Sequence, residues 1–461
     1  MDDTEIAYQK SLDYLYSFVD YSLTKAFRYS PEKFNLSRMV DLMANLGNPQ
    51  SKYKIIHVAG TKGKGSCSAM IASVLSAAGY KVGFYTSPHL RDYNERIQVN
   101  NQPIPHQTLT NLVNEMKQVV PKTPEVTTFE LTTAIAFNYF AQENVDVAVI
   151  EVGLGGRLDA TNIVDPILSV ITSLSLDHMY ILGDTLAKIA FEKGGIIKEG
   201  RPVVLSPQKE EARLVIEEIA QKRNAKLIQV GFDYHYAAWT HSLDKQSFLV
   251  WPATDQPYID AYIESGITTD WQPVELSIPL LGYHQVENAA TAYAAILAAR
   301  IEGLTIDDTA IREGFKKVFW PGRFEVLNRQ PLLIIDSAHN RDSALKLRLA
   351  IEDYLPAKPV ILVFGASEDK DVPGMFAELL PRVTQLIATQ SIHPRAIEPE
   401  KLVDLAHQFG VRAKAIEPVE AAIKKALELA GNDAAVIVGG SIFIAAAARD
   451  VWQDMVMLSN A

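Results

Sequence analysis

Short apolar runs rich in β-branched residues alternate along the chain with longer segments of helical period. This alternation is typical of parallel β-sheets whose faces are covered by helices. The strands that the pattern predicts span residues 53–58, 81–86, 145–150, 167–172 and 202–205, and then 332–335, 359–364, 383–389 and 434–438. The sequence therefore predicts an α/β fold built on mostly parallel sheets.

The predicted strands form two series, separated by a segment of different character. Residues 232–278 hold three of the five tryptophans and alternate apolar with polar positions, with little helical period, so we expect a small antiparallel insert. A helix is predicted over 285–301, and the turn residues at 319–322 mark the best domain boundary. We therefore predict an N-terminal domain over 1–320 and a smaller C-terminal domain over 321–461.

Length, charge and cysteine content limit the number of domains, the kinds of partner and the cellular compartment that we expect for this protein. A chain of 461 residues is too long for one core, and a formal charge of −11 argues against a nucleic-acid partner. The single cysteine, Cys67, indicates a reducing compartment. The acidic N-terminus lacks the segments of a signal peptide, and the apolar stretch 434–448 is shorter than the roughly 20 residues that span a bilayer. We expect a cytoplasmic protein with no membrane partner.

Polar side chains follow the predicted strands at their carboxyl ends, where open parallel sheets bind ligands. The first such segment is a glycine-rich loop before a predicted amphipathic helix with apolar residues at 67, 70, 71, 74, 75 and 78. The loop residues are Gly60, Thr61, Lys62, Gly63, Lys64, Gly65 and Ser66. The strict P-loop spacing is absent, because Val58 occupies the first glycine position and Gly65 separates the lysine from the serine. A glycine turn with two surface lysines is the alternative, but strand, loop and helix in this order favour phosphate binding.

A second glycine-rich segment begins at Glu151, directly after a predicted strand. Gly153, Gly155 and Gly156 do not match the G-x-G-x-x-G spacing of dinucleotide-binding folds, so hydride transfer is a weak interpretation. A carboxylate at a strand end near a phosphate loop is better explained as a Mg²⁺ ligand, the alternative being an ordinary acid beside a turn. Another strand is followed by His178, for which metal coordination competes with a structural role.

Lys193 lies on a short predicted helix that Asp184 or Thr185 caps and that Gly194-Gly195 ends. Leu186, Ile189, Ala190 and Lys193 share one face of this helix, so the amine points the way the apolar side chains point. Spacing alone favours snorkelling, in which the amine reaches water. The alternative is a buried amine with a lowered pKa, which can react with CO₂ to form a carbamate.

The remaining candidates are weaker taken singly. His284, Gln285 and Asn288 lie at a predicted helix start, where they could cap the helix or contact a base edge. Arg323 follows the predicted boundary, and Asp336-Ser-Ala-His339-Asn340 follows a strand of the second series. Capping and surface pairing remain the alternative for all of them.

Taken together, these segments resemble the Mur ligase superfamily and, within it, the folylpolyglutamate synthases and dihydrofolate synthases. The segments that carry the resemblance are Thr86-Ser-Pro-His-Leu90, Glu151 to Asn162, Asp177-His178 and Glu192-Lys193-Gly-Gly-Ile196, in an overall similarity that runs from 46–50 to 393–396. The resemblance implies an N-terminal P-loop ATPase domain that carries the insert, followed by a Rossmann-like C-terminal ligase domain. Two residues depart from the usual pattern: Lys62 stands where many relatives have asparagine, and Gly194-Gly195 where Ala-Gly is usual.

The resemblance also assigns roles to individual residues. Its catalytic positions are Lys64, His178 and a carbamylated Lys193, which reverses the interpretation from spacing alone. The nucleotide-binding positions are Gly60, Thr61, Gly63, Lys64, Gly65, Ser66, Asn288, Arg323, Asp336 and His339. The Mg²⁺ positions are Ser87, Glu151, His178 and Lys193, and the pterin positions are Phe129 and Asp159. Two Mg²⁺ ions are expected with ATP, and a monovalent cation is left open.

The function that the resemblance implies is an ATP-dependent ligase that adds L-glutamate to a folate or dihydropteroate carboxylate through an acyl phosphate, acting as a monomer. Two alternatives remain: a related ligase for another carboxylate, such as a cell-wall precursor, and a nucleotide-gated regulatory ATPase. The sequence leaves open which acceptor is used, the length of the product and the role of the insert.

Overall fold

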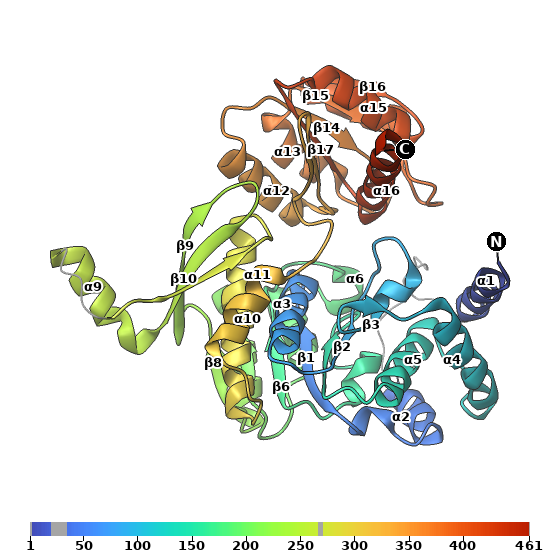
Figure 1. Ribbon diagram of the computed structural model, residues 1–461, viewed down its shortest axis with the longest axis vertical. Coiled ribbons are helices and arrows are strands. Elements are labelled where there is room, and N and C mark those ends of the chain that lie inside the picture. Colours follow the sequence, from blue (N-terminus) through green and yellow to red (C-terminus); the bar gives the residue numbers. More distant parts are fainter. Residues whose placement is uncertain (1, 20–34, 266–270, 461) are drawn as a thin grey trace. The chain divides into compact units, whose positions relative to one another are not determined.

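The computed structural model describes residues 2–19, 35–265 and 271–460 (Figure 1). Contacts within the chain define two compact units. Unit 1 comprises Met1–Ala237, Leu249–Leu276 and Glu287–Val318, and unit 2 comprises Ala238–Phe248, Ser277–Val286 and Phe319–Ala461. The chain therefore enters unit 2 three times, so the units do not follow one another along the sequence.

Within the described residues, unit 1 is built on an eight-stranded sheet in the order β4-β3-β2-β5-β1-β6-β7-β8. From β2 to β8 the neighbouring strands are parallel, and β3 and β4 form an antiparallel edge. The strands are β1 (Lys54–Ala59), β2 (Val82–Tyr85), β3 (Ile97–Val99), β4 (Gln102–Pro103), β5 (Val147–Glu151), β6 (Leu168–Ile171), β7 (Val203–Leu205) and β8 (Leu227–Gln229). The predicted fold class, a mostly parallel sheet in an α/β domain, is confirmed.

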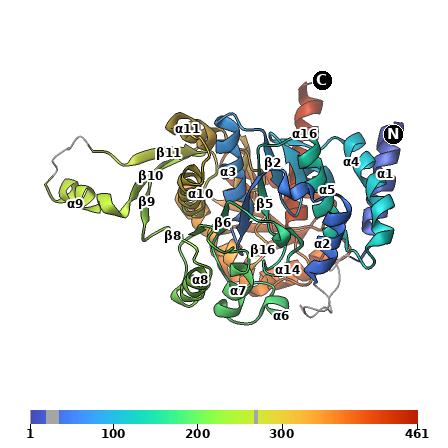
Figure 2. The same ribbon diagram turned by 90° about the horizontal axis from the view of Figure 1, so that it is seen from below.

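Helices cover both faces of this sheet. The helices of unit 1 are α1 (Asp3–Tyr16), α2 (Leu36–Asn45), α3 (Lys64–Ala77), α4 (His106–Val119), α5 (Thr128–Gln142), α6 (Met179–Leu182), α7 (Leu186–Gly194), α8 (Glu210–Lys222), α11 (Asp308–Lys317) and α10 (Tyr283–Ile301), whose first residues belong to unit 2. Figure 2 shows α3, α10 and α11 on one side of the strands and α7 and α8 on the other. Because both faces are covered, β1 is apolar at every buried position except His57.

Helix α3 differs from its prediction, because it is buried on all sides instead of on one face. Every residue from 66 to 75 is buried. Its outer side is covered by α11, where Ser73 Oγ donates a hydrogen bond of 2.7 Å to the carbonyl oxygen of Gly314. A Cβ atom at Gly314 would lie 2.4 Å from Val74 Cα, so only a glycine lets the two helices approach this closely.

The segment predicted as an antiparallel insert contains the strands β9 (Tyr234–His241), β10 (Gln246–Pro252) and β11 (Val274–Ile278), in the sheet order β11-β10-β9. Strands β9 and β10 form a hairpin, in whose turn Ser242 N–H donates to Lys245 O at 2.8 Å (Figure 1). The expectation of little helix was wrong, because α9 (Gln256–Ser265) follows the hairpin. Residues 266–270 of the insert lie outside the described residues.

Unit 2 holds a sheet in the order β12-β13-β17-β14-β15-β16, parallel except for the pairing of β12 with β13. Its strands are β12 (Glu325–Arg329), β13 (Leu332–Ile335), β14 (Val360–Phe364), β15 (Gln385–Ala388), β16 (Arg412–Ala415) and β17 (Ala435–Gly439). Its helices are α12 (Arg341–Tyr354), α13 (Val372–Leu379), α14 (Pro399–Gln408), α15 (Val419–Ala430) and α16 (Ile442–Asn460). Side chains of α12, α13 and α14 share one core with the sheet, and those of α15 and α16 share the other.

The apolar stretch near the C-terminus is a strand, a turn at Gly440 and the start of α16, as predicted. Across the part of the chain that the structure describes, no helix is both long and apolar enough to cross a bilayer.

Candidate active site

The sheet order places the candidate segments of unit 1 next to one another. Strands β2, β5, β1 and β6 are parallel neighbours, so their carboxyl ends share one edge of the sheet. Ser87 follows β2, Glu151 ends β5, the glycine-rich loop follows β1, and His178 follows β6. Residues that are far apart in the sequence are thus brought to a single edge.

The glycine-rich loop requires glycine at two positions. Gly63 has φ +85° and directly precedes α3, and Gly60 has φ +150°. A Cβ atom at Gly60 would lie 1.9 Å from Thr172 Oγ1. The backbone N–H groups of Thr61 and Lys62 donate to Ser173 O at 2.9 and 3.0 Å, so the segment after β6 holds the loop in place. The loop therefore presents the N-terminus of α3, which favours anions.

Lys64 is the first residue of α3, and its Nζ lies 3.9 Å from Glu151 Oε1. The other carboxylate oxygen, Oε2, accepts hydrogen bonds from Thr86 Oγ1 and, at 3.4 Å, from Ser87 N–H. The Glu151 side chain is only 5% exposed. The two neighbouring strand ends thus hold a buried carboxylate beside the lysine of the phosphate loop.

Lys193 is buried, and the interpretation that its amine reaches water was wrong. Thr185 caps α7 by accepting a hydrogen bond from Lys188 N–H, and Lys193 lies on the buried face with Ile189 and Ala190. Its Nζ donates a hydrogen bond of 2.9 Å to Gly60 O. Burial, reinforced by the positive charges of Lys64 and Lys62, lowers the pKa of Lys193 to about 7. A large fraction of this amine is therefore neutral near physiological pH.

His178 directly follows Asp177, and an ion pair joins Asp177 to the phosphate loop. Lys62 Nζ lies 2.8 Å from Asp177 Oδ2, and Asp177 Oδ1 accepts a hydrogen bond of 3.0 Å from His178 N–H. His178 has φ +49°, a left-handed conformation that is uncommon for residues other than glycine. Its imidazole is 47% exposed, so it remains accessible to a ligand.

Asn288, a predicted nucleotide contact, lies against the phosphate loop from α10. A Cβ atom at Gly63 would be 2.1 Å from Asn288 Oδ1, so the amide occupies the space that a side chain at Gly63 would need. The turn of α10 that carries Asn288 thus packs directly over the start of α3.

The loop after β5 forms the next part of the site. Asp159 is 5% exposed; its Oδ2 accepts from Leu154 N–H at 2.9 Å, and its Oδ1 accepts from Thr161 N–H at 3.0 Å and Thr161 Oγ1 at 2.6 Å. Burial raises the pKa of Asp159, although these hydrogen bonds act in the opposite direction. The ring of Phe129 covers the same loop, because a Cβ atom at Gly153 would lie 2.4 Å from its Cζ.

The same loop is joined to α7. Arg157 Nη2 pairs with Glu192 Oε1 at 2.8 Å, and Asn162 Nδ2 donates to Gly195 O at 3.1 Å. The loop that holds Asp159 and the helix that holds Lys193 are therefore positioned together. An alanine at Gly194 would require the end of the Ile219 side chain to move, because its Cβ would lie 2.6 Å from Ile219 Cδ1.

In unit 2, Asp336 follows β13 and is 8% exposed. Its two oxygens accept hydrogen bonds of 2.8 Å from Phe324 N–H and Ala338 N–H. Burial raises the pKa of Asp336, while the nearby Arg323 guanidinium opposes this shift. His339 Nδ1 lies 2.9 Å from Ser337 O. Arg323, Asp336 and His339 thus belong to one loop cluster of unit 2.

His284 is a part-buried residue of the same unit. Burial, together with the charges of Lys346 and Arg323, lowers the pKa of His284 to about 3. Its imidazole is therefore neutral at physiological pH. Gln285, the next residue, is buried.

The oxygen-rich donor set at the edge of unit 1 fits Mg²⁺. Among the residues that the structure describes, no three His, Cys, Asp or Glu side chains gather as a ready-made metal cluster. The carboxylate of Glu151 and the hydroxyl of Ser87 are hard oxygen donors, which Mg²⁺ prefers, and this ion usually keeps waters and substrate phosphates as its other ligands. A site completed by the nucleotide suits this arrangement better than a closed protein cage.

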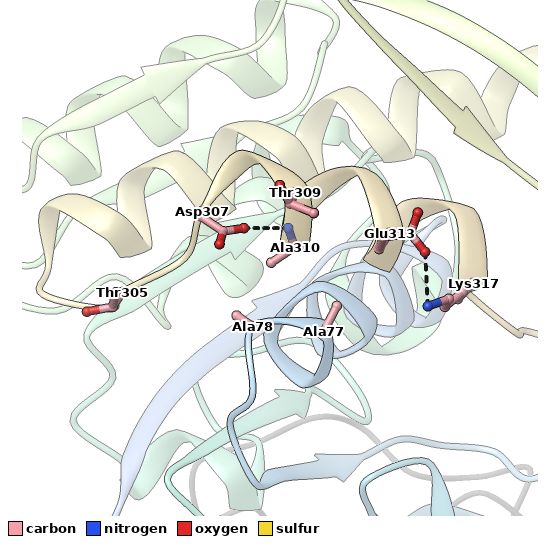
Figure 3. Close-up of a pocket in the computed structure, with 8 residues that line it drawn as sticks. All are labelled: Ala77, Ala78, Thr305, Asp307, Thr309, Ala310, Glu313 and Lys317. Atoms are coloured by element: carbon pink, nitrogen blue, oxygen red, sulfur yellow. Dashed lines mark hydrogen bonds and ion pairs between the residues drawn. The ribbon is translucent and has the colours of Figure 1, made fainter.

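A surface hollow of about 340 Å³ lies elsewhere in unit 1 (Figure 3). It is lined by Ala77, Ala78, Thr305, Asp307, Thr309, Ala310, Glu313 and Lys317. These residues belong to the C-terminal end of α3, to α11 along its length from Thr309 to Lys317, and to the segment before α11. Since α3 has 14 residues, this hollow lies about 20 Å along the helix from Lys64 and is separate from the phosphate loop.

Several residues of the site were missed by the sequence analysis. Thr86 donates one hydrogen bond to Glu151, and Ser173 O accepts two from the phosphate loop. Thr161 holds the carboxylate of Asp159, and His57 contacts Thr161 from inside β1. A polar residue inside an otherwise apolar strand was the available signal for His57.

Comparison with known proteins agrees with this arrangement. The Mur ligase middle domain matches residues 58–296, and the Mur ligase glutamate ligase domain matches residues 322–442. A protein of Bacillus subtilis (strain 168) named dihydrofolate synthase/folylpolyglutamate synthase is 36% identical over 419 residues, which cover 89% of this chain and 93% of the relative.

Two solved structures match nearly the whole chain. Folylpolyglutamate synthase from Thermotoga maritima is 32% identical, with a TM-score of 0.82 and 97% of each chain covered. Escherichia coli FolC in complex with DHPP and ADP is 31% identical, with a TM-score of 0.82, covering 97% of this chain and 98% of that one. The chain therefore belongs to the folylpolyglutamate synthase/dihydrofolate synthase family of the Mur ligases, and it is an ATP-dependent ligase.

Proposed function

We propose that this ligase joins L-glutamate to the free carboxylate of dihydropteroate, of a folate, or of both, through an acyl phosphate. Relatives over most of the chain carry the names of these two activities. The observation that carries the proposal is the single sheet edge at which the phosphate loop, with Lys64, lies beside the buried Glu151 carboxylate. Such an edge suits a triphosphate whose terminal phosphate is transferred.

The reaction requires an activated carboxyl group, because a carboxylate does not condense with an amine in water. The acceptor carboxylate oxygen attacks the γ-phosphorus of ATP, and the bond from this phosphorus to the β–γ bridging oxygen breaks, releasing ADP. Lys64 neutralises charge on the phosphate oxygens during this step. The glutamate α-amine then attacks the acyl carbon and loses a proton, and phosphate leaves with its oxygen.

Ser87, Glu151 and His178 would hold Mg²⁺, which supplies further neutralisation of the phosphate charge when bound. Thr86 and Ser87 N–H hold one oxygen of Glu151, Oε2, and the other oxygen, Oε1, lies 3.9 Å from Lys64 Nζ. Four further residues are proposed to contact the nucleotide. They are Asn288, which lies against the phosphate loop, and Arg323, Asp336 and His339 in unit 2.

Lys193 is proposed to be carbamylated. Its neutral amine would attack CO₂, forming an N–C bond and releasing one proton, and the product would be an anion. The lowered pKa of Lys193 supports this step, because only the neutral amine is nucleophilic. The positive charges of Lys62 and Lys64 nearby would stabilise the anion. A ¹³C carbamate signal in labelled bicarbonate, absent from Lys193→Met, is the expected result.

Phe129 and Asp159 are proposed to bind the heterocycle of the acceptor. The Phe129 ring offers an apolar face next to the loop after β5, and the Asp159 carboxylate is a hydrogen-bond acceptor for ring N–H groups. Asp159 belongs to the loop that is joined to the Lys193 helix, and Phe129 packs against that loop.

The test is a phosphate-release assay with ATP, Mg²⁺ and glutamate, comparing dihydropteroate with tetrahydrofolate as the acceptor. Release that requires both glutamate and one of these acceptors supports the proposal and identifies the acceptor. Release that is independent of glutamate would indicate a regulatory ATPase. If neither acceptor stimulates release while another carboxylate does, the acceptor class is wrong.

A further inference from the structure

His57 is a buried histidine that the proposed reaction does not use. It lies in the middle of β1 with no exposed surface, among residues that are otherwise apolar. Its Nε2 is 2.8 Å from Thr161 Oγ1, and its Nδ1 has no hydrogen-bond partner among the described residues. Burial, followed by the charge of Lys198, lowers the pKa of His57 to about 3, so the ring is neutral. A buried ring nitrogen without a partner is costly, and an apolar residue at this position would avoid that cost.

The hydrogen bonds of Thr161 determine which nitrogen of His57 carries the proton. Thr161 Oγ1 donates its single hydrogen to Asp159 Oδ1, at 2.6 Å. The same oxygen must therefore accept from His57, so Nε2 carries the hydrogen and Nδ1 does not. The hydrogen bonds run in one direction, from the His57 ring through the threonine hydroxyl to the Asp159 carboxylate.

This chain of hydrogen bonds fixes one oxygen of Asp159. Oδ1 accepts from both the N–H and the hydroxyl of Thr161, and Oδ2 accepts from Leu154 N–H. Without His57, the threonine hydroxyl could turn away from Asp159, and Oδ1 would lose one of its two donors. The imidazole thus keeps the hydroxyl proton directed at Oδ1.

We propose that His57 is a positioning residue for the acceptor substrate: through Thr161 it holds the Asp159 carboxylate in the orientation that receives the N–H groups of the acceptor heterocycle. The inference rests on the proposed function of Asp159. The hydrogen bond of His57 reaches Thr161, in the loop after β5, so its proposed role concerns the acceptor site and not the phosphate loop. Loss of His57 therefore weakens acceptor binding and leaves ATP binding intact.

The test compares variants that remove or keep the donor at this position. His57→Leu removes it, and His57→Gln keeps an N–H near the position of Nε2. Thr161→Val removes the hydroxyl that links His57 to Asp159. Ser169→Ala is the matched control, because Ser169 lies opposite His57 on the neighbouring strand β6. Its hydroxyl donates to Ile196 O at 2.9 Å and takes no part in the hydrogen bonds from His57 to Asp159. Equilibrium binding of dihydropteroate and tetrahydrofolate, KM for ATP and thermal midpoints are measured for each full-length variant.

We expect His57→Leu and Thr161→Val to weaken binding of the preferred acceptor about 3- to 10-fold, the range of one lost hydrogen bond. Their double variant should be no weaker than either single variant, because both remove the same interaction. His57→Gln and Ser169→Ala should stay within about twofold of the wild type, and KM for ATP should change less than twofold throughout.

Unchanged acceptor binding in His57→Leu and Thr161→Val would overturn the proposal, as would equal losses of acceptor and ATP binding. If His57→Leu does not fold, Thr161→Val and His57→Gln still decide the question. Asp159→Asn separates this failure from failure of the proposed function. If Asp159→Asn weakens acceptor binding and the other variants do not, only the role of His57 is wrong. If Asp159→Asn has no effect, the assignment of Asp159 is wrong as well.

Discussion

The amine of Lys193 donates a hydrogen bond of 2.9 Å to the backbone carbonyl of Gly60, the first residue of the phosphate loop. The lysine is on α7 and the glycine follows β1, so this bond joins two elements separated by more than a hundred residues. It places a buried amine next to two further lysines of the loop, and the positive charges and the burial together lower its pKa to about 7.

The first prediction concerns the pH dependence of stability. Between about pH 7 and the usual lysine pKa of about 10.4, the unfolded chain holds a proton on Lys193 that the folded protein lacks. Stability of the ligand-free protein should therefore rise with pH across this window, in buffer free of bicarbonate. Lys193→Met should lack this part of the slope, as measured by urea denaturation at pH 7, 8 and 9.

Lys188→Met serves as the control for this prediction. Lys188 lies on the same helix but is exposed and pairs with Asp184. Its variant should keep the slope of the wild type. Equal slopes in Lys193→Met and the wild type would show that the amine titrates normally.

The second prediction concerns the two lysines of the phosphate loop. Lys64→Ala should lower ATP-dependent ligation about 100-fold or more, because a charge directed at the transferred phosphate is lost. Lys62→Asn removes the ion pair with Asp177 but leaves the charge of Lys64 in place, and it should retain most of the activity. Steady-state phosphate release with glutamate present measures both variants. Near-normal ligation by Lys64→Ala would exclude the proposed role.

The third prediction concerns Gly63. A side chain here would collide with Asn288 Oδ1, 2.1 Å from the new Cβ, and would also be strained by φ +85°. Gly63→Ala should abolish measurable ADP binding by calorimetry. Gly79→Ala is the matched control, because Gly79 has φ +90° with no atom within 4 Å of the new Cβ. It should cost only the left-handed strain, about 1–2 kcal/mol of stability, and leave ADP binding unchanged. Similar ADP affinities in both variants would contradict the assignment of Gly63.

The fourth prediction concerns the contact between α11 and α3. Alanine normally favours a helix over glycine by about 1 kcal/mol. At Gly314, however, the new Cβ would lie 2.4 Å from Val74 Cα, and backbone must move to relieve the contact. Gly314→Ala should therefore lower the free energy of unfolding by about 1–3 kcal/mol. The exposed Lys316→Ala on the same helix should change it by less than about 0.5 kcal/mol. Denaturant unfolding of both variants measures the difference, and a stabilised Gly314→Ala would refute the close contact.

The sequence alone determined the central strands of both sheets and the position of the phosphate loop. A strand buried on both faces must be a continuous apolar run, and loops that bind phosphate need glycines before a helix. Both features can therefore be recognised from a short stretch of sequence. The edge strands β4, β8, β12 and β16, and β3 next to β4, were not predicted, because short strands at or near an edge are less apolar and gain their pairing from neighbours.

The tertiary structure alone decided features that depend on residues distant in sequence. Whether Lys193 is buried depends on what covers α7 and on the Gly60 carbonyl that accepts from its amine. The apolar pattern of residues 186–194 gives no information about either. Similarly, α3 is buried all round only because α11 packs on its outer side. The function of His57 follows from a hydrogen bond to a residue 104 positions away. Local pattern fixes which segments form strands and helices, whereas burial, pKa and hydrogen-bond direction are set by the neighbours that folding brings together.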